Sequence, residues 1–348
     1  ANKPWGEKNH IAFGLAAKHM SLDVKESVTP PWNFPVIDTI PGTQTPTTGL
    51  PNSNIPIIDY HYQSNPSNFD RVTGFVQNST DLSKRISLSL GIKFEESDLS
   101  GSSIQPGARF SYLLDEGNIL WGAYSRAYRQ ASLVEQYTKV SYARVYDPIN
   151  SVWINQSFAG NPSLDDEKMD AYELGWRTRP SDKLLIELSL YHYETKNAVF
   201  SGPPKYDTSD VKTTGGELTF DYRASRSWHL QGGYSYSKGK KDGVKQDDFP
   251  ESMANLSSHL KLRDDLTFIQ SLYYTGDRTI PSAYNPIPID DYLRLDLGFV
   301  WQPKDNWEIG LFGRDLLDPG HAENMYNDLD VEPGRVERTF LLSITKKF

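Results

Sequence analysis

The run RVERTFLLSITKKF, Arg335 to Phe348, indicates the fold class of this chain. Its apolar residues occupy alternate positions, namely Phe340, Leu342, Ile344 and Phe348. The opposite parity is mostly polar, with Thr339, Ser343 and Thr345, and Lys346 interrupts the apolar set near the end. Because successive side chains of a strand point to opposite faces, this run predicts a β-strand with one apolar and one wet face.

The same alternation recurs along the chain, for example in Ile86–Phe94, Glu217–Ala224 and Leu293–Trp301. Each segment has about ten residues, the length that a tilted strand needs to cross a membrane. The pattern predicts an all-β fold, an antiparallel transmembrane β-barrel, with about fourteen strands in this chain. These strands are expected to begin near Asn9, Asp70, Lys84, Pro106, Asn118, Met169, Lys183, Lys212, Ser227, Ala254, Leu266, Ile289, Asn306 and Arg335.

The joints between these segments alternate between short and long. The short ones consist of polar turn-forming residues: Asp81–Ser83, Asp115–Gly117, Arg179–Asp182, Ser225–Arg226, Asp264–Asp265 and Pro303–Asp305. The long ones are Ser21–Phe69, Tyr128–Lys168, Lys196–Val211, Gly239–Met253, Gly276–Pro288 and Asp318–Gly334. Short turns on one side and long loops on the other are typical of outer-membrane barrels, in which the short turns are periplasmic. Within the second long joint, alternation at Val140–Tyr146 predicts a hairpin that continues the flanking strands beyond the membrane.

A soluble β-sandwich or propeller also has many short strands, so both are alternatives. Propeller blades would repeat every 40 to 50 residues or so, and no such repeat is found. A sandwich would not need a long loop at every second joint. Tryptophans near the strand ends fit the aromatic girdles of a membrane barrel better. They are Trp121, Trp176, Trp228, Trp301 and Trp307.

Composition narrows the possible functions. The 348 residues include no cysteine, so no disulfide or thiolate metal site can form. Asp and Glu number 45 against 36 Lys and Arg, which argues against nucleic acid as a partner. No run of about eighteen apolar residues suggests a transmembrane helix. Catalytic, P-loop and dinucleotide motifs are not found, so we expect neither an enzyme nor a cofactor. The first residues, ANKPWGEKNH, contain no apolar signal segment.

Several segments resemble TonB-dependent outer-membrane receptors, in the order in which that family has them. Leu90–Glu95 is similar to the family's LGxRxE strand, and Gln105–Arg109 is similar to its QPRxR segment. Trp121–Arg129 resembles WxxxSRAxR, although Gln130-Ala131 replaces the usual Thr-Pro. Gly216-Glu217 resembles a late GxE strand, Gly313–Pro319 resembles GxNLLDP, and Phe348 resembles the aromatic terminus read by the barrel-assembly machinery.

The resemblance implies a 22-stranded barrel with an N-terminal plug, of which this chain would supply the last fourteen strands. We therefore expect residues 1–348 to form one partial barrel domain, with no plug or signal peptide, complete at Phe348 and cut at Ala1. A plugless derivative that closes as a smaller barrel is the alternative to a fragment of a receptor. It also implies a bacterial outer-membrane location and active uptake of a large scarce solute, an iron–siderophore complex before vitamins, haem or oligosaccharides. Implied partners are membrane lipid, lipopolysaccharide, the siderophore-like ligand, and the TonB complex through the plug. A passive porin-like channel and a structural or adhesive barrel remain alternatives.

Ligand contacts are expected in the long loops and at the upper end of the barrel interior. Aromatic faces with a few guanidinium groups suit a planar or anionic ligand such as a metal chelate, although such residues are also ordinary membrane-interface anchors. The candidates are Tyr124, Arg126, Tyr128, Arg129, Tyr137, Tyr142, Arg144, Tyr146 and Trp153. No metal site is expected, because His321 has no second His or Cys near it in the sequence and is expected to structure its loop.

Overall fold

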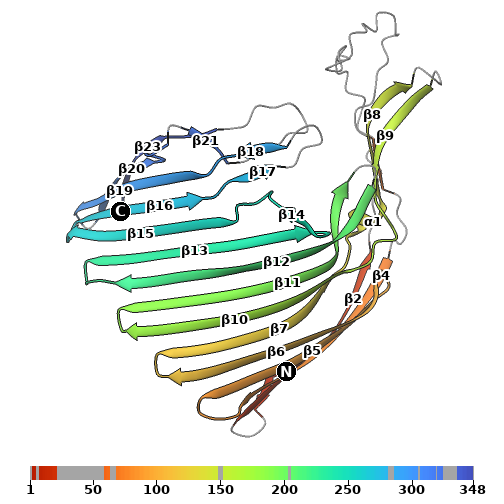
Figure 1. The fold of residues 1–348 in the computed structure, drawn as a ribbon, viewed down its shortest axis with the longest axis horizontal. Coiled ribbons are helices and arrows are strands. Elements are labelled where there is room, and N and C mark those ends of the chain that lie inside the picture. The colour runs from red at the N-terminus through yellow and green to blue at the C-terminus, as the bar shows by residue number, and fades with distance from the viewer. Residues whose placement is uncertain are drawn as a thin grey trace, which may run out of the picture.

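The computed structural model describes residues 2–4, 8–21, 59–62, 68–147, 152–202, 205–280, 286–304, 306–318, 320–323 and 335–347. Its main body is a single sheet of long strands that follow one another along the chain (Figure 1). They are β2 (Asn9–Ser21), β4 (Asn68–Asp81), β5 (Ile86–Ser97), β6 (Gly101–Asp115), β7 (Asn118–Arg129), β10 (Glu167–Ser181), β11 (Leu184–Gly202), β12 (Lys205–Arg223), β13 (Trp228–Lys241), β15 (Ser252–Arg263), β16 (Leu266–Thr275), β19 (Tyr292–Lys304), β20 (Trp307–Arg314) and β23 (Thr339–Lys346).

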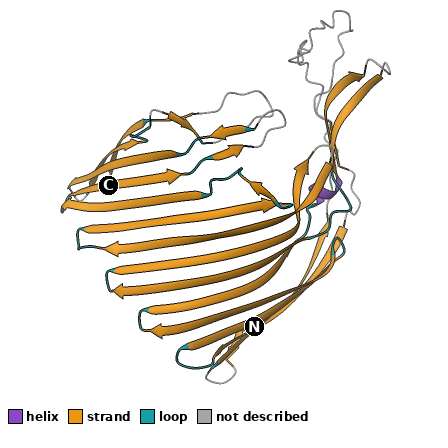
Figure 2. Ribbon diagram, in the orientation of Figure 1, coloured by secondary structure: helices purple, strands orange, loops and turns teal. Residues whose placement is uncertain are grey.

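These fourteen strands confirm the number predicted from the alternation, and each pairs antiparallel with the next. The remaining elements are short or lie outside this meander. They are β1 (Asn2–Pro4), β3 (Asp59–Tyr62), α1 (Leu133–Tyr137), β8 (Thr138–Asp147), β9 (Val152–Ala159), β14 (Val244–Gln246), β17 (Arg278–Ile280), β18 (Ile287–Ile289), β21 (Gly320–Ala322) and β22 (Arg335–Glu337). Among the described residues α1 is the one α-helix (Figure 2). That part of the chain has no helix with the length and apolar character to cross a membrane.

The sheet is curved and has two edges. β23 pairs with β20, and at the other end β1 pairs with β2, with no further partner for either within the described ranges. Figure 1 shows the resulting open, curved wall. The fold is therefore the antiparallel barrel wall that the alternation predicts, open within the described ranges as the family resemblance implies.

One end of the sheet, here named the turn end, carries the six predicted short turns, which lie along the left of Figure 1. At Asp115 the carboxylate Oδ1 accepts hydrogen bonds from the Gly117 N–H (2.9 Å) and the Asn118 side chain (2.6 Å). These bonds fix the turn between β6 and β7 and hold the pKa of Asp115 below its ordinary value. Such local side-chain to backbone bonds explain why Asp and Asn mark these positions in the sequence.

The opposite end, here named the loop end, carries the long connections. One prediction there is wrong: residues 196–211 are not a loop, because β11 runs to Gly202 and β12 begins at Lys205. Their pairing is shifted by an irregularity between Thr195 and Ala198. The hairpin predicted near Val140–Tyr146 is present as β8 and β9, although α1 separates it from β7 (Figure 1).

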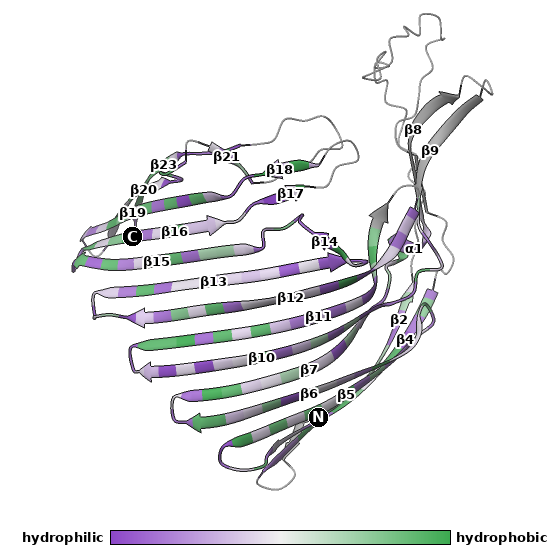
Figure 3. Cartoon of the chain, viewed as in Figure 1, coloured by the Kyte–Doolittle hydropathy of each residue, from purple (hydrophilic) through white to green (hydrophobic). Residues whose placement is uncertain are grey.

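The two faces of the sheet differ in chemistry, as the alternation along the strands in Figure 3 shows. On one face, here named the apolar face, Leu174 is opposite Leu190, and their exposed fractions are 63% and 49%. The other, here named the polar face, carries ion pairs such as Lys93 with Glu95, Arg177 with Glu187, and Arg294 with Asp296. Large apolar side chains that stay exposed across a whole sheet are expected of a lipid-facing surface, and the polar face then lines the barrel interior.

The tryptophans near the turn end largely match the predicted girdle. Trp176, Trp228 and Trp301 lie exposed on the apolar face, and the Trp301 indole N–H donates to Asp265 Oδ2 at 2.9 Å. Trp121 does not fit that prediction. It shares its parity with Ser125 and lies on the polar face, where the Arg109 guanidinium carbon is 4.8 Å from the centre of its ring. The prediction failed because it rested on the position of Trp121 near a strand end and not on the face of the sheet to which its parity assigns it.

Candidate functional site

At the loop end, the connection after β7 folds into the short helix α1. Its first turn is closed by a capping box: Ser132 Oγ accepts from the Glu135 N–H at 3.2 Å, and the Glu135 carboxylate accepts from the Ser132 N–H at 2.6 Å. This reciprocal pair satisfies two backbone donors that a helix start would otherwise leave open. The Asn161 N–H donates to the Glu135 carbonyl at 2.8 Å, so α1 is also tied to the segment that leads into β10.

Arg129, the last residue of β7, joins two carboxylates at this place. Its guanidinium donates to Glu167 Oε2 and Oε1 at 2.6 and 2.7 Å, and to Glu135 Oε2 and Oε1 at 3.1 Å each. Glu167 also accepts from the Val199 N–H at 2.6 Å. Partial burial alone would raise the pKa of Glu135. The bonds from Arg129 and Ser132 outweigh it and hold that pKa below the ordinary value.

A second arginine lies beside this pair on the same polar face. The Arg71 guanidinium donates to the Gln130 side-chain oxygen and lies 3.6 Å from Glu95 Oε1. Burial raises the pKa of Asp166 in the neighbouring connection, with the charge of Glu95 adding to it. We name the set Arg71, Glu95, Arg129, Glu135 and Glu167 the mouth cluster. It places two guanidinium groups and three carboxylates at the loop end of the polar face.

The structure separates the predicted contact residues of β7 by parity. Tyr124, Arg126 and Tyr128 follow Leu120 and Gly122 on the apolar face, whereas Arg129 lies on the polar face. Both Asp170 oxygens are occupied there: Oδ1 accepts from Arg126 at 2.7 Å and from the Tyr124 hydroxyl at 2.9 Å, and Oδ2 accepts from Arg126 at 3.0 Å. These residues form a closed polar group above the exposed leucines.

The other predicted contact residues lie in or beside the hairpin. Tyr137 is the last residue of α1. Tyr142, Arg144 and Tyr146 belong to β8 and Trp153 to β9, where Tyr146 is the backbone partner of Trp153. The side chains of these four residues lie outside the described part of the structure. Of the five candidates with described side chains, Arg129 belongs to the mouth cluster, and Tyr137 follows Glu135 by two residues in α1.

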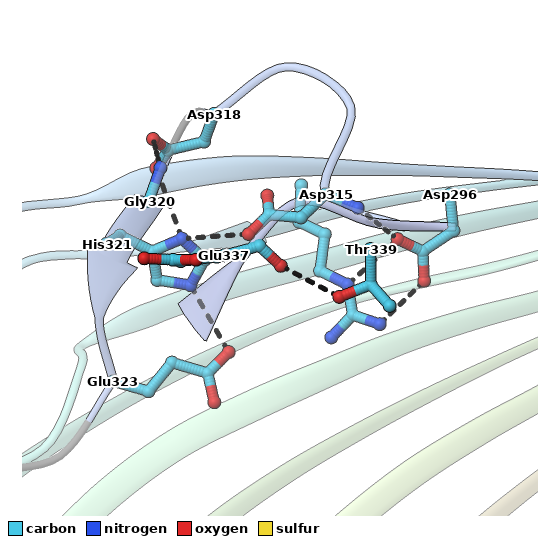
Figure 4. Close-up of polar contacts among 9 residues, drawn as sticks. Asp296, Asp315, Asp318, Gly320, His321, Glu323, Glu337 and Thr339 are labelled. Atoms are coloured by element: carbon cyan, nitrogen blue, oxygen red, sulfur yellow. Dashed lines mark hydrogen bonds and ion pairs between the residues drawn. The ribbon is translucent and has the colours of Figure 1, made fainter. Parts of the chain in front are cut away.

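A second polar group, at the loop end of β19 and β20, was not foreseen as a unit. The Asp315 N–H donates to Asp296 Oδ1 at 3.0 Å, and Arg294 donates to the same carboxylate at 2.9 and 2.6 Å. Asp315 has a left-handed backbone, with φ of 58°, and its side chain points toward His321 (Figure 4). The Tyr292 ring is stacked on the His321 imidazole, with centroids 3.8 Å apart.

Sequence reasoning missed this group because it looked for a second His or Cys beside His321. The signal was present in another form, since Asp315, Asp318 and His321 are spaced three residues apart. The mouth cluster was harder to foresee, because Arg129 and Glu167 are 38 positions apart and are joined only by the pairing of β7 with β10.

Comparison with known proteins places the fold among receptor barrels. The family model described as TonB dependent receptor-like, β-barrel, matches residues 22–316. Similar solved structures include a mutant of the ferric enterobactin receptor PfeA from Pseudomonas aeruginosa, with 16% identity and a TM-score of 0.67 over 100% of this chain and 52% of that one. The siderophore receptor PirA from Acinetobacter baumannii has 14% identity and a TM-score of 0.69, over 100% of this chain and 53% of that one. The ferric-catecholate import receptor Fiu from K12 E. coli has 15% identity and a TM-score of 0.64, over 98% of this chain and 51% of that one. The chain thus spans about half the length of the solved structures that it matches.

Proposed function

Because the chain belongs to the TonB-dependent receptor-like β-barrel family, we propose that it forms part of the wall of an outer-membrane receptor for active uptake of a large scarce solute. The solute that we propose is an iron–siderophore complex. The observation that carries this proposal is the family match over residues 22–316, which covers most of the fourteen-strand sheet. Structural likeness to receptors described as binding ferric enterobactin or ferric catecholates supports the choice of solute.

The two faces of the sheet support a membrane location. An apolar face with exposed Leu174, Leu190 and Leu218 would be costly in water and suits the hydrocarbon of a bilayer. The polar face suits a wet interior, in which the turn end would face the periplasm and the loop end the outside. In such a receptor the wall performs no chemistry. It binds the solute at the loop end, and TonB acts through a plug domain.

For the binding surface we propose the mouth cluster and the adjoining α1 and β8–β9 hairpin. Arg129 is the leading contact residue because it lies on the polar face and its side chain is 46% exposed despite its two carboxylate partners. A guanidinium in that position can exchange a protein carboxylate for an oxygen of an anionic metal chelate. Tyr137, at the end of α1, and the aromatic residues of the hairpin would supply the flat surfaces that such a ligand contacts.

The outward side of the loop end supports a second partner, lipopolysaccharide. Lys212, Lys238 and Lys240 continue the parity of the exposed Leu218 and are themselves exposed. Lys212 is already paired with Glu194, at 2.6 Å. The backbone partners of Lys238 and Lys240 on β12 are Thr214 and Lys212, and the charge of Lys238 also acts on the Glu251 carboxylate. Lysines in this place, just beyond an apolar band, are suited to the phosphate groups of an outer-leaflet lipid.

The test is uptake of radiolabelled iron, supplied as a ferric catecholate, by cells whose only receptor of this kind is the intact protein that contains this chain. We expect uptake in cells with a working TonB and none in cells without it. Equal uptake in both strains would contradict active transport and would support a passive channel. Failure to take up or bind any ferric chelate would contradict the proposed solute.

A matched pair of variants tests the binding surface. Arg129→Ala should weaken binding of the chelate by about tenfold or more, the loss expected when a charged hydrogen bond disappears. Arg126→Ala should leave binding unchanged, because Arg126 lies three residues earlier on the apolar face and is held by Asp170. Equal effects of the two substitutions on affinity would contradict this assignment. Heat-dependent gel migration checks that both variants fold.

A further inference from the structure

Three side chains at the loop end of β19 and β20 direct ligand atoms toward one point (Figure 4). His321 Nδ1 lies 3.1 Å from Asp318 Oδ2 and 3.3 Å from Asp315 Oδ2. One ligand atom from each of the three residues lies within 4.8 Å of the others. Metal–ligand bonds to His and Asp are about 2.0–2.2 Å long. The separations of 3.1 and 3.3 Å are therefore short enough for His321 to share one cation with either aspartate, and a small side-chain movement suffices for all three atoms to reach it.

The proton positions on His321 show what the three atoms lack. Its second nitrogen, Nε2, lies 3.2 Å from Glu323 Oε1, and an ionised carboxylate can only accept. Nδ1 faces carboxylates as well, since Asp318 Oδ2 lies 3.1 Å from it. A neutral imidazole has a single N–H and can donate to only one side. With that proton on Nε2, Nδ1 presents a lone pair to Asp315 and Asp318, and no proton lies among these three acceptors. A metal-bound histidine shows this arrangement, because its outer N–H is usually held by a carboxylate.

Asp315 gives the second, independent observation. Its side chain is 1% exposed, and neither of its carboxylate oxygens accepts a hydrogen bond from any described residue. A buried carboxylate that accepts no hydrogen bond is strongly destabilising, so something must compensate it. The carboxylate is aimed at the point that His321 Nδ1 and Asp318 also face, and His321 itself is 8% exposed.

We propose that Asp315, Asp318 and His321 bind a divalent transition-metal ion, with Zn²⁺ as the best match. One imidazole nitrogen with two carboxylates suits zinc, which would keep a water molecule as a fourth ligand. Calcium and magnesium fit less well because they prefer an all-oxygen set. A doubly protonated His321 is the competing explanation. It would supply one proton at Nδ1 for two carboxylates, and the Asp315 oxygens would still accept no well-aligned hydrogen bond.

The ion would have a structural role, because it would link two segments of the barrel. This proposal does not depend on which solute the receptor transports. His321 belongs to β21, which pairs with β22 just before β23. Asp315 is anchored to β19 through Asp296. Zinc would therefore fix the connection between β20 and β23 to the loop end of β19. Asp318 and His321 themselves line a pocket of about 420 Å³ there, together with Asp290, Tyr292 and Arg335.

The experiment measures zinc on the intact receptor, purified in detergent without a polyhistidine tag, stripped with a chelator and dialysed against Zn²⁺. We expect the wild type to retain one equivalent of zinc more than His321→Asn. Asp318→Asn should bind zinc about tenfold or more weakly. Glu323→Gln, which alters only the partner of the outer nitrogen, should weaken binding by about tenfold to a hundredfold. Cobalt binding gives an independent readout, because its visible absorption reports nitrogen and oxygen ligation.

His229→Asn is the matched control. His229 also contacts a carboxylate, with Nε2 at 3.0 Å from Asp221 Oδ2, but this pair is half-exposed and no buried carboxylate joins it. Its zinc content should equal that of the wild type. Equal zinc in the wild type and in folded His321→Asn would overturn the proposal in favour of the imidazolium pair. Equal losses in His321→Asn and His229→Asn would overturn it as well. Heat-dependent gel migration shows which variants are folded.

Discussion

Gly175 faces Trp121 across the pairing of β7 with β10, and the indole ring occupies the place where a side chain at position 175 would begin. A Cβ atom there would lie 2.2 Å from Trp121 Cε2. The ring cannot move freely, because Arg109 is stacked on it. Because Gly175 has no side chain, the Trp121 ring can pack directly against the backbone of β10. Glycine in a strand often marks such a close approach.

Gly175→Ala should destabilise the barrel by about 1–3 kcal/mol, the usual cost of forcing extra volume into a filled site. The measurement is the denaturant midpoint of the receptor in detergent, followed by tryptophan fluorescence. Gly107→Ala on β6 is the control, since its Cβ would meet only the Tyr124 carbonyl oxygen at an ordinary 3.9 Å. Equal midpoints for the two variants would show that Trp121 yields at no cost.

Glu135 makes the docking of α1 dependent on pH. Its folded pKa lies below the ordinary 4.5. A lowered folded pKa means that the ionised carboxylate stabilises the folded state. That stabilisation is fully present above the unfolded pKa and is lost as pH falls through the folded pKa. Because Arg129 is half-exposed, the contribution is about 1 kcal/mol or less.

We expect the backbone protection factors of α1, which are exchange rates corrected for the intrinsic pH dependence of amide exchange, to fall several-fold below about pH 4.5. Arg129→Ala should weaken this pH dependence, because it removes the strongest partner of the Glu135 carboxylate. Equal protection factors at pH 7 and at pH 3 would show that Glu135 does not hold α1 in place.

At the scale of elements, the exposed lysines on the apolar-face side of β13 should affect how much lipopolysaccharide the receptor binds. Lys238 and Lys240 share the apolar-face parity, whereas the next residue, Lys241, lies on the polar face with its ammonium 3.3 Å from the centre of the Phe200 ring. Replacing Lys238 and Lys240 together by Gln should reduce the lipopolysaccharide that copurifies with the receptor by about two- to tenfold, since each surface lysine contributes on the order of 1 kcal/mol to anionic lipid binding.

Lys241→Gln is the control for this prediction, because it removes one positive charge, half of what the double variant removes, from the opposite face. Lipopolysaccharide is measured by quantifying its lipid phosphate per mole of protein. A loss that is equal for Lys241→Gln and for the double variant would show that net charge, and not an outward site, determines the lipid content.

How well the sequence predicts each strand depends on whether the strand carries the exposed apolar side chains that lie between the turn end and the middle of the sheet, here named the apolar band. Between the turn end and the middle of the sheet, alternation such as Ile86–Phe94 predicted both the strands and their faces, because lipid and water select opposite side chains. Beyond the band both faces meet water. The strands through Phe200 and Tyr206 therefore lack a regular apolar parity, and alternation did not predict them.

The same reasoning explains the partial success at the candidate site. The outward direction of Tyr124 and Arg126 could have been predicted by following the alternation from Leu120 along the same strand. The contacts of Arg129 with Glu167 and of Asp315 with His321 could not have been predicted in this way. The first pair depends on the register between two strands. The second depends on an irregular connection in which Asp315 has a left-handed backbone.

At the scale of the whole molecule, the open edges of the sheet govern how this chain can exist in a membrane. β23 has a paired side toward β20, and its other side has no partner among the described strands. In hydrocarbon each unpaired backbone group costs several kcal/mol, so an open edge must find a partner strand. The partner can be a further strand of a larger barrel, the β1–β2 edge of the same chain, or the edge of another copy.

A polypeptide of residues 1–348 alone should therefore associate through its edges in detergent and should not give a heat-modifiable monomer. Since the chain has no cysteine, single cysteines can report this. Leu342→Cys on β23 should form disulfide-linked dimers, whereas Leu190→Cys, on the same face but in the interior strand β11, should not. In the intact receptor neither should cross-link, because the barrel is closed. A monomeric, heat-modifiable 348-residue species that conducts ions steadily in liposomes would contradict this prediction. It would show that the chain closes on itself, and a passive channel would then replace active uptake as the proposed function.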